Sequence, residues 1–386
     1  MVRFAHIADV HLGGWKQPEL SALNSKSFVK AIDICIAEKL DFVLIAGDLF
    51  DTAFPGIEVL KETFAEFKKL KEAKIPCFII AGSHDYSVSG KTFLDVLEKA
   101  GFCKNVENYD ETEEKITLNP TIYGRVAIYG FPGRKSGLEV PLIKKIKLND
   151  APGMFKILML HTTLDKVKGN LPIDSVEADS LPKVDYYAMG HIHIDFQYEN
   201  FVYPGPIFPN NFKELEDLQH GRFCIVDTDS PKVLKKIELR FKNTLPVEIE
   251  LKNALTATEK IIQELGKKDL EDKIVLLRLK GELQTGNNSD IKFSKIEEFV
   301  KQKGAYFLLR NTHELKAKEP EIEIDITDTD NIEEKTIDSY CQENPSQFNS
   351  LVYQLMDALS IEKQEGETNE GFTSRIFENA RKVLKI

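Results

Sequence analysis

The sequence lacks a long uncharged apolar run, and its first residues lack the basic-then-apolar pattern of a secretion signal. A helix that crosses a bilayer needs about 20 consecutive apolar residues, and a signal peptide needs an apolar stretch behind a basic start. We therefore expect no membrane association and a cytoplasmic location.

Cysteine is scarce and unpaired. The cysteines are odd in number, widely scattered and without a C-x-x-C pair, and they are Cys35, Cys77, Cys103, Cys224 and Cys341. A disulfide framework or a zinc site would need an even or closely spaced set. We expect reduced, mostly buried thiols.

Positive charge is also in deficit. The 51 Lys and Arg residues are outnumbered by 62 Asp and Glu residues, which gives a formal net charge of -11. Such a chain is poorly suited to coating a nucleic acid broadly, because phosphate neutralisation needs clustered Lys and Arg. A local site remains possible where bound cations supply the attraction for phosphate.

Apolar strands alternate with segments of helical periodicity over about the first 240 residues. FAHIADVH, FVLIAGDLFD and CFIIAGSHD are apolar runs that each end in a polar cluster. Between them, residues 27–39 and 57–73 place apolar side chains at helical spacing. A polar loop, LGGWKQPEL, precedes the first of these two segments. The pattern predicts a layered α/β domain over residues 1–240, with its site at the strand ends.

Three further parts follow this domain. Residues 245–318 alternate strand and helix patterns and predict a small α+β domain. Residues 319–344 are predicted to be an exposed linker, because 319–334 hold eight acidic residues and no Lys or Arg. Residues 345–386 carry two short amphipathic segments, 346–360 and 371–385. Such helices either pack back on the chain or dock on a partner, and the acidic linker favours a partner.

Five strand-to-loop junctions carry metal-ligand side chains. They are Asp9 with His11, Asp48, Ser83 with His84, His161, and His191 with His193, which together hold five of the eight histidines. A single histidine in such a place is more often a hydrogen-bonded core residue, but the whole set favours a metal site. Asp and His donors without Cys suit Mn, Fe or Zn.

The donors outnumber what one ion takes, so we predict two ions with Asp48 between them. Two cations about 3.5–4 Å apart can activate a shared water and clamp phosphoryl oxygens during an in-line displacement. The sequence therefore predicts phosphate ester hydrolysis.

The motif order D-x-H, GD, G-S-H-D, H, G-H-x-H resembles that of the calcineurin-like metallophosphoesterases. The fuller pattern of HIADVHLG, LIAGDLFD and GHIH followed by YPGP is similar to the DNA double-strand-break repair nucleases of the Mre-eleven and SbcD group. The resemblance is strong over residues 1–210. Beyond them it is limited to the order of the predicted domains.

This resemblance implies a β-sandwich catalytic domain flanked by helices, with a small DNA-capping domain behind it. It also implies a homodimer that acts on DNA with two Mn²⁺ ions per subunit. The C-terminal helix pair of the family binds an ABC-type ATPase with long coiled coils.

The resemblance also implies roles for single residues. Asp9, His11, Asp48 and His193 would hold one metal, and Asp48, His161 and His191 would hold the other. His84 matches the catalytic histidine beside the scissile phosphate. Ser83 stands where the family usually has a ligating Asn, so the second ion is expected to bind more weakly.

Contacts with DNA are expected from loop residues near these motifs. Trp15 could stack on a base and Lys16 could meet a phosphate, although a loop Trp that covers its own domain is an equal alternative. Arg125, Arg134 and Lys135 are further candidates. Asp51 stands where some relatives place a His that positions the DNA strand, so exonuclease action is less expected than endonuclease action.

Two other functions remain open. The first domain alone would suit a metallophosphatase for small molecules or proteins, because fold and metals do not name the substrate. The second domain and the helical tail argue against it. Ser83 also permits a DNA-binding scaffold with weak nuclease activity, which metal content would distinguish from an enzyme.

Overall fold

The computed structural model describes residues 2–87, 90, 92–169, 173–229, 233–317, 337–338, 340–342, 344–346, 348–363 and 369–385. The chain divides into two compact units, Met1–Lys316 and Ala317–Ile386.

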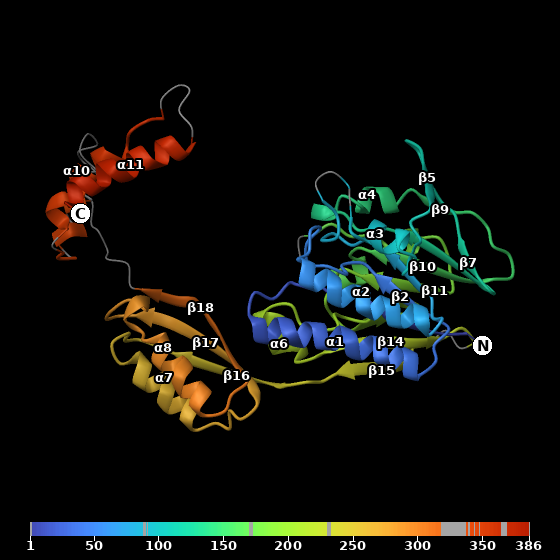
Figure 1. Cartoon of the computed structure of the whole chain (residues 1–386), viewed down its shortest axis with the longest axis horizontal. Coiled ribbons are helices and arrows are strands. Elements are labelled where there is room, and N and C mark those ends of the chain that lie inside the picture. Colours follow the sequence, from blue (N-terminus) through green and yellow to red (C-terminus); the bar gives the residue numbers. More distant parts are fainter. Residues whose placement is uncertain are drawn as a thin grey trace. The chain divides into compact units, whose positions relative to one another are not determined.

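Two six-stranded sheets form the body of the first unit (Figure 1). The first sheet has, in spatial order, β15 (Val233–Leu239), β14 (Gly221–Asp227), β1 (Arg3–Ile7), β2 (Phe42–Ala46), β3 (Cys77–Ile80) and β4 (Lys104–Asn105). The second has β12 (Phe196–Tyr198), β13 (Phe201–Tyr203), β11 (Tyr186–Gly190), β10 (Phe155–His161), β8 (Val126–Phe131) and β7 (Thr121–Tyr123). In both sheets the central strands run parallel.

The two sheets pack face to face. Phe4, Leu44 and Ile80 from the first sheet share one buried core with Ile128 and Met159 from the second. The residues of β2, FVLIA, are all buried, as expected for a strand that is covered on both faces. This sandwich explains why the central strands are continuous apolar runs in the sequence.

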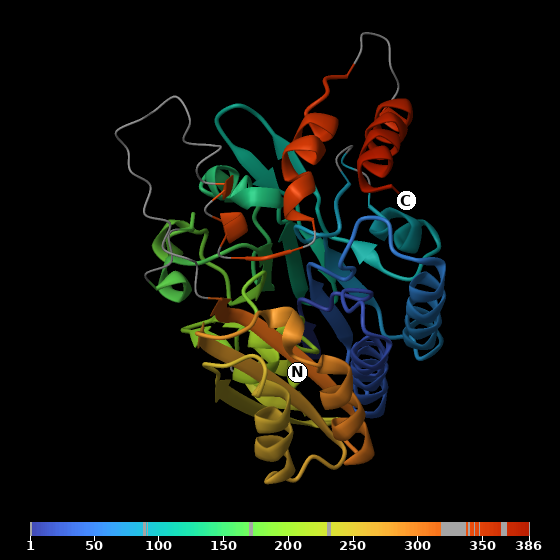
Figure 2. The same ribbon diagram turned by 90° about the vertical axis from the view of Figure 1, so that its left-hand side faces the viewer.

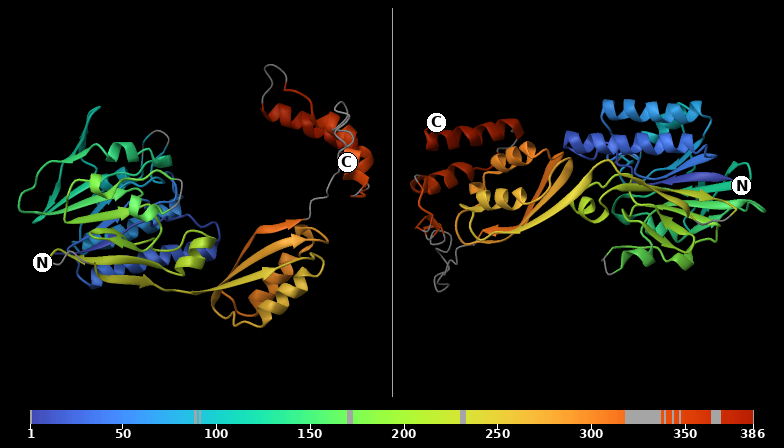
Figure 3. Two further views of the ribbon diagram at one scale, coloured as in Figure 1. Left: turned by 180° about the vertical axis from the view of Figure 1, so that it is seen from behind. Right: turned by 90° about the horizontal axis from the view of Figure 1, so that it is seen from below.

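Helices α1 (Pro18–Ala37) and α2 (Ile57–Glu72) cover the outer face of the first sheet, as the right-hand view of Figure 3 shows. The outer face of the second sheet is covered by α4 (Val140–Ile143) and by a small sheet of β5 (Tyr109–Glu111), β6 (Ile116–Leu118) and β9 (Ile146–Leu148). Helix α3 (Leu94–Lys99) leads into β4. These layers confirm the predicted α/β domain.

Helix α1 begins nine residues earlier than its predicted start at Ser27. Proline is favoured in the first turn of a helix, because it has no backbone N–H to leave unpaired there. Leu20 and Leu23 are buried and extend the apolar stripe toward this start. The predicted polar loop LGGWKQPEL is therefore too long, because its last residues, 18–20, form the first turn of α1.

A three-stranded sheet follows β15. Its strands are β16 (Asn243–Glu250), β17 (Lys273–Leu283) and β18 (Phe307–Ala317), with β17 in the middle. Helices α7 (Ala257–Gly266) and α8 (Phe293–Gln302) lie on one face and form a separate core with it (Figures 1 and 2).

The opposite face of this sheet packs on the larger part of the unit. Ile274 and Leu276 of β17 join a buried cluster with Leu20, Leu23 and Leu215. Because the two parts share this cluster within one compact unit, we keep the division at residues 240–245 as a proposal.

The second unit contains a 3₁₀ turn (Asn349–Leu351) followed by α10 (Val352–Leu359), and α11 (Asn369–Leu384), which contacts α10. The helix predicted over 346–360 is therefore α-helical only from Val352. The predicted acidic linker lies largely outside the described residues. Within the described part of the chain, every helix is too short or too polar to cross a membrane.

Candidate metal centre

The predicted ligands converge at one edge of the sandwich, where the parallel strands of both sheets end. Asp9 and His11 follow β1, Asp48 follows β2, and Ser83 and His84 follow β3, while His161 ends β10 and His191 and His193 follow β11. Three groups have donor atoms within 4.8 Å of one another: Asp9, His11 and His193; His11, Asp48 and His84; and Asp9, Asp48 and His161.

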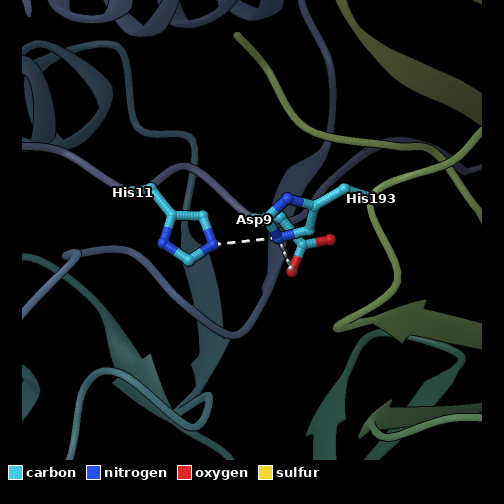
Figure 4. A group of neighbouring side chains, drawn as sticks. All are labelled: Asp9, His11 and His193. Atoms are coloured by element: carbon cyan, nitrogen blue, oxygen red, sulfur yellow. Dashed lines mark hydrogen bonds and ion pairs between the residues drawn. The ribbon is translucent and has the colours of Figure 1, made fainter. Parts of the chain in front are cut away.

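Asp9, His11 and His193 form the first group (Figure 4). The rings of His11 and His193 turn toward one another, with Nε2 of each ring 3.0 Å apart. Nε2 of His193 also lies 3.9 Å from Oδ1 of Asp9. Oδ2 of Asp9 is buried and has no hydrogen-bond partner among the described residues. Such an orphaned carboxylate oxygen among imidazole nitrogens suits a divalent ion.

His161 and Asp48 form the second contact of the site. Nδ1 of His161 lies 2.9 Å from the carbonyl of Ala46, so it carries a proton that it donates there. In the neutral ring Nε2 is then a bare acceptor, and it lies 3.1 Å from Oδ2 of Asp48, which is an acceptor too. Two acceptors this close need a proton or a metal ion between them.

The electrostatics of this contact fit that requirement. Burial disfavours a charged ring, but the negative charge and hydrogen bond of Asp48 raise the pKa of His161 to about 10. Burial also works against the carboxylate of Asp48, yet His161 and His11 hold the pKa of Asp48 well below its usual range. Before a metal binds, the site therefore takes up a proton in its place.

His191 stands in the opposite state. Burial, together with the charge on His161, lowers the pKa of His191 to about 4, so its ring is neutral and can act as a ligand. Its backbone N–H donates to Oδ1 of Asp9 at 2.8 Å. This bond ties the loop after β11 to the loop after β1.

Four of the predicted ligand residues have left-handed backbone conformations. The φ angles are 51° for Asp9, 47° for His11, 50° for Asp48 and 94° for His191. Each such backbone conformation costs on the order of 1–3 kcal/mol of folding free energy and persists only where the surrounding structure imposes it. Here the N–H groups of Val10 and His11 both donate to the carbonyl of Asp48, at 2.9 Å. Gly47, with φ 87°, leaves the room that His161 occupies, because a β-carbon there would overlap its Nδ1.

The loop that carries Ser83 and His84 is fixed beneath Asp48. The backbone N–H of His84 donates to Oδ1 of Asp48 at 2.8 Å, and the Ser83 hydroxyl lies 3.5 Å from Oδ2. Asp85, buried below, accepts from the N–H groups of Gly82 at 2.9 Å and Phe50 at 3.0 Å. Burial and the nearby Asp48 raise the pKa of Asp85 to about 7.

Asp51 faces two histidines. Its Oδ1 lies 3.2 Å from Nδ1 of His11 and 3.7 Å from Nδ1 of His84. Its backbone carbonyl lies 2.8 Å from Nδ1 of His84. The hydrogen bond from His11 outweighs burial and lowers the pKa of Asp51. Asp51 is thus a charged partner of the histidines, which the sequence interpretation did not anticipate.

A cavity of about 760 Å³ opens beside the metal ligands. Ser83, His84 and His191 line it, together with Asp51. Of the residues considered for DNA contact, Lys135 also lines it and supplies positive charge. A phosphate ester that enters this cavity would meet His84 beside the metal ligands.

Trp15 and Lys16 lie elsewhere, in an open groove of about 560 Å³ between their loop and residues 309–313 of β18. The indole N–H of Trp15 donates to the carbonyl of Pro209 at 2.9 Å, so this ring packs on its own domain. Arg125 directly precedes β8, which runs parallel to β10. It therefore lies at the sheet edge opposite His161 and is not brought to the metal ligands.

Sequence reasoning missed two supporting carboxylates, Asp85 and Glu214. Oε1 of Glu214 lies 2.9 Å from Nδ1 of His193. Asp85 directly follows His84, and this adjacency was a usable signal. Glu214 lies in an acidic helical stretch, FKELEDL, where no pattern marks one acid above the others.

A family model described as calcineurin-like phosphoesterase matches residues 2–195. The chain is 27% identical over 307 residues to the DNA double-strand break repair protein Mre11 of Archaeoglobus fulgidus, which covers 72% of this chain and 68% of that protein. It is 34% identical over 206 residues to Mre11 of Sulfurisphaera tokodaii, with 49% of this chain and 48% of the relative covered.

A third relative carries a different name. The metallophosphoesterase YhaO of Bacillus subtilis is 31% identical over 235 residues, which cover 55% of each chain. The chain therefore spans about half the length of several relatives it matches and about two thirds of others.

Proposed function

This chain belongs to the calcineurin-like phosphoesterase family, and on that premise we propose that it is a Mn²⁺-dependent DNA nuclease of double-strand-break repair. The family confirms the prediction of a metal-dependent phosphodiesterase. The choice of DNA as substrate rests on the likeness to proteins named Mre11, and on the added domain and tail.

One observation carries the two-metal part of the proposal. Oδ2 of Asp48 lies 3.6 Å from Nε2 of His11 and 3.1 Å from Nε2 of His161, so one carboxylate serves both ligand groups. One ion would be held by Asp9, His11, His193 and Asp48. The other would be held by His161, His191 and the same Asp48, with Ser83 beside it. Two ions supply an activated water at neutral pH and neutralise the charge that develops on the phosphate.

His84 has the position of a residue that acts on the phosphate. Its Nδ1 is engaged by the carbonyl of Asp51, which leaves Nε2 for the substrate. Its side chain is 46% exposed and lines the cavity. We assign to His84 the orientation of the phosphate and the protonation of the leaving oxygen.

The proposed homodimer has a candidate surface near the start of α2. Phe54 is 71% exposed and Ile57 is 79% exposed. Large apolar side chains that are this exposed and only three residues apart are candidates for an interaction site, and a second copy would cover them. Phe54→Glu with Ile57→Glu should yield a monomer by sedimentation velocity. An unchanged mass would place the dimer contact elsewhere.

The proposed partner ATPase has a candidate site on α10 and α11. Met356, Leu359 and Phe377 are exposed on these helices. Amphipathic helices of this kind dock their apolar face into a groove on a partner.

The decisive assay compares Mn²⁺-dependent cleavage of linear and hairpin DNA with hydrolysis of a phosphomonoester. We expect DNA cleavage that disappears with chelator and returns with Mn²⁺. Rapid turnover of the monoester with inert DNA would favour the metallophosphatase instead. Failure to bind two Mn²⁺ ions per chain would favour the scaffold.

A further inference from the structure

We propose that Glu214 is a positioning residue of the metal centre, which fixes His193 with Nε2 toward Asp9 and His11. The inference rests on the proposed metal site, and it adds a residue that neither the motifs nor the family match includes, since the matched region ends at residue 195. Glu214 lies on α6 (Phe212–Leu218), beyond β13 in the sequence.

The contact defines which nitrogen of His193 is free. Oε1 of Glu214 lies 2.9 Å from Nδ1 of His193, and a carboxylate can only accept, so the ring proton resides on Nδ1. Nε2 is then the ligand atom, and it is the nitrogen that lies 3.0 Å from Nε2 of His11 and 3.9 Å from Asp9. A carboxylate behind a ligating imidazole fixes its tautomer and orientation and strengthens it as a donor.

The same arrangement recurs at the neighbouring histidines. His161 has the carbonyl of Ala46 behind its Nδ1, and His11 has Asp51 behind its Nδ1. Glu214 completes this pattern for His193.

Glu214 is itself held in one orientation. Its Oε2 accepts from the backbone N–H of Asn210 at 2.8 Å, and its Oε1 accepts from the side-chain amide of Asn211 at 2.5 Å. The backbone N–H of Glu214 donates in return to Oδ1 of Asn211, which caps α6. A carboxylate with these bonds has little freedom to turn from His193.

Helix α6 also joins the metal ligand to the three-stranded sheet. Arg278 of β17 donates to Oε2 of Glu216 at 2.8 Å and lies over the ring of Phe212, 5.0 Å from its centroid. Glu216 provides a matched control for Glu214. It lies two residues away on the same helix, has similar exposure, and contacts Arg278 instead of the site.

The test uses the full chain and Mn²⁺ alone, without DNA. Glu214→Ala should weaken Mn²⁺ binding at one of the sites about 10–100-fold by calorimetric titration, whereas Glu216→Gln should bind as the wild type does. The metal-free protein is measured above pH 9, because burial is outweighed by Glu214 and Asp9, which raise the pKa of His193 to about 9, and only the neutral ring has tautomers. There the ring-nitrogen chemical shifts of His193 should report a proton on Nδ1, and Glu214→Ala should shift the ring toward mixed tautomers. Glu214→Gln, which keeps the size of the side chain, is the second variant to be measured if Glu214→Ala fails to fold.

Wild-type Mn²⁺ affinity in Glu214→Ala, or an unchanged Nδ1–H signal in that variant, would overturn the proposal. If the wild type binds no Mn²⁺, the tautomer measurement still shows whether Glu214 orients the ring of His193. If the wild type binds Mn²⁺ but leaves DNA intact, the proposed nuclease function fails while the role of Glu214 stands.

Discussion

Oδ1 of Asp51 lies 3.2 Å from Nδ1 of His11, so a residue predicted to face the DNA is also the partner of a predicted metal ligand. The amide of Asn210 lies 3.4 Å from the same oxygen, which gives the carboxylate contacts on two sides. Its negative charge is therefore directed at the histidines. The prediction that this charge disfavours exonuclease action stays a prediction, and the geometry offers a way to test it.

Replacing Asp51 should separate its charge from its hydrogen bond. Asp51→Asn still offers an oxygen to His11, so Mn²⁺ affinity should fall only a few-fold, while Asp51→Leu should lose roughly 10–100-fold. Calorimetric titration measures both. Asp174→Asn is the control, because Asp174 is an exposed acid that lines the same cavity. Equal affinities for the Asn and Leu variants would show that the hydrogen bond is unimportant.

The same variants test the exonuclease prediction. If the charge at Asp51 hinders the approach of a DNA end, Asp51→Asn should raise the ratio of exonuclease to endonuclease products at saturating Mn²⁺. An unchanged ratio would remove Asp51 as the cause.

His84 and His191 should differ in what they lose. His84→Ala keeps the backbone N–H that donates to Asp48, so we expect near wild-type metal content with hydrolysis lowered by about 10²–10⁴-fold. His191→Ala should lose metal as well as activity. Elemental analysis and a DNA cleavage assay distinguish the two. Loss of metal in His84→Ala would instead make His84 a ligand, as its proximity to His11 and Asp48 permits.

The clustering of the proposed ligands could be predicted because its signal is local. Each of these residues follows or ends an apolar strand, and parallel strands of one sheet bring their carboxyl ends to one edge, so Asp9 and Asp48 could be expected together. Arg125 shows the limit of such reasoning. Only the parallel pairing of β8 with β10 reveals that Arg125, just before β8, lies at the sheet edge opposite His161.

Other features depend on contacts between segments that are distant in the sequence. Asp9 and Asp48 have left-handed backbones because each is held by the loop of the other, and no residue type announces this. Glu214 contacts His193 across 21 residues from a helix whose acids look alike in sequence. Leu20, in the first turn of α1, is buried with Ile274 and Leu276 of β17, a contact that the local sequence pattern could not show.

Ser83 should limit the second metal. A neutral hydroxyl is a poorer donor than an amide carbonyl oxygen, and the Ser83 hydroxyl lies 3.5 Å from Oδ2 of Asp48. Ser83→Asn should therefore tighten the binding of the second Mn²⁺ ion and raise activity at limiting Mn²⁺. Ser83→Ala shows what the hydroxyl contributes. Superimposable titrations of the Ser and Asn proteins would contradict this role.

His6 should make stability fall in mild acid. It lies in the core with Nδ1 2.9 Å from the hydroxyl of Tyr186, and burial lowers its pKa from 6.5 to about 3. Between these values the unfolded chain binds a proton that the folded chain excludes. The free energy of unfolding should therefore decrease as pH falls below 6.5, by up to about 1.4 kcal/mol per pH unit.

Denaturant unfolding at pH 7 and at pH 5 measures this effect. His6→Phe with Tyr186→Phe removes both polar groups and should flatten the pH dependence, whereas Tyr186→Phe alone should retain it. Equal slopes in the double variant and the wild type would assign the acid sensitivity to other groups.

The tail should bind its partner through side chains that α10 and α11 leave exposed. Leu355 and Phe372 are also apolar residues of these helices, but they are half-buried, so a charge there would also enter a partly covered apolar surface. Leu359 and Phe377 are 51% and 63% exposed and are better placed to meet a groove on another protein.

Leu359→Glu with Phe377→Glu should abolish co-purification with a coiled-coil ATPase while Mn²⁺-dependent cleavage by the isolated subunit persists. Gln354→Glu with Ser374→Glu adds the same charge at exposed polar positions of the same helices and should leave binding intact. Retained binding in the first pair would refute the docking role, and loss of cleavage in that pair would mean that the tail supports its own catalytic domain.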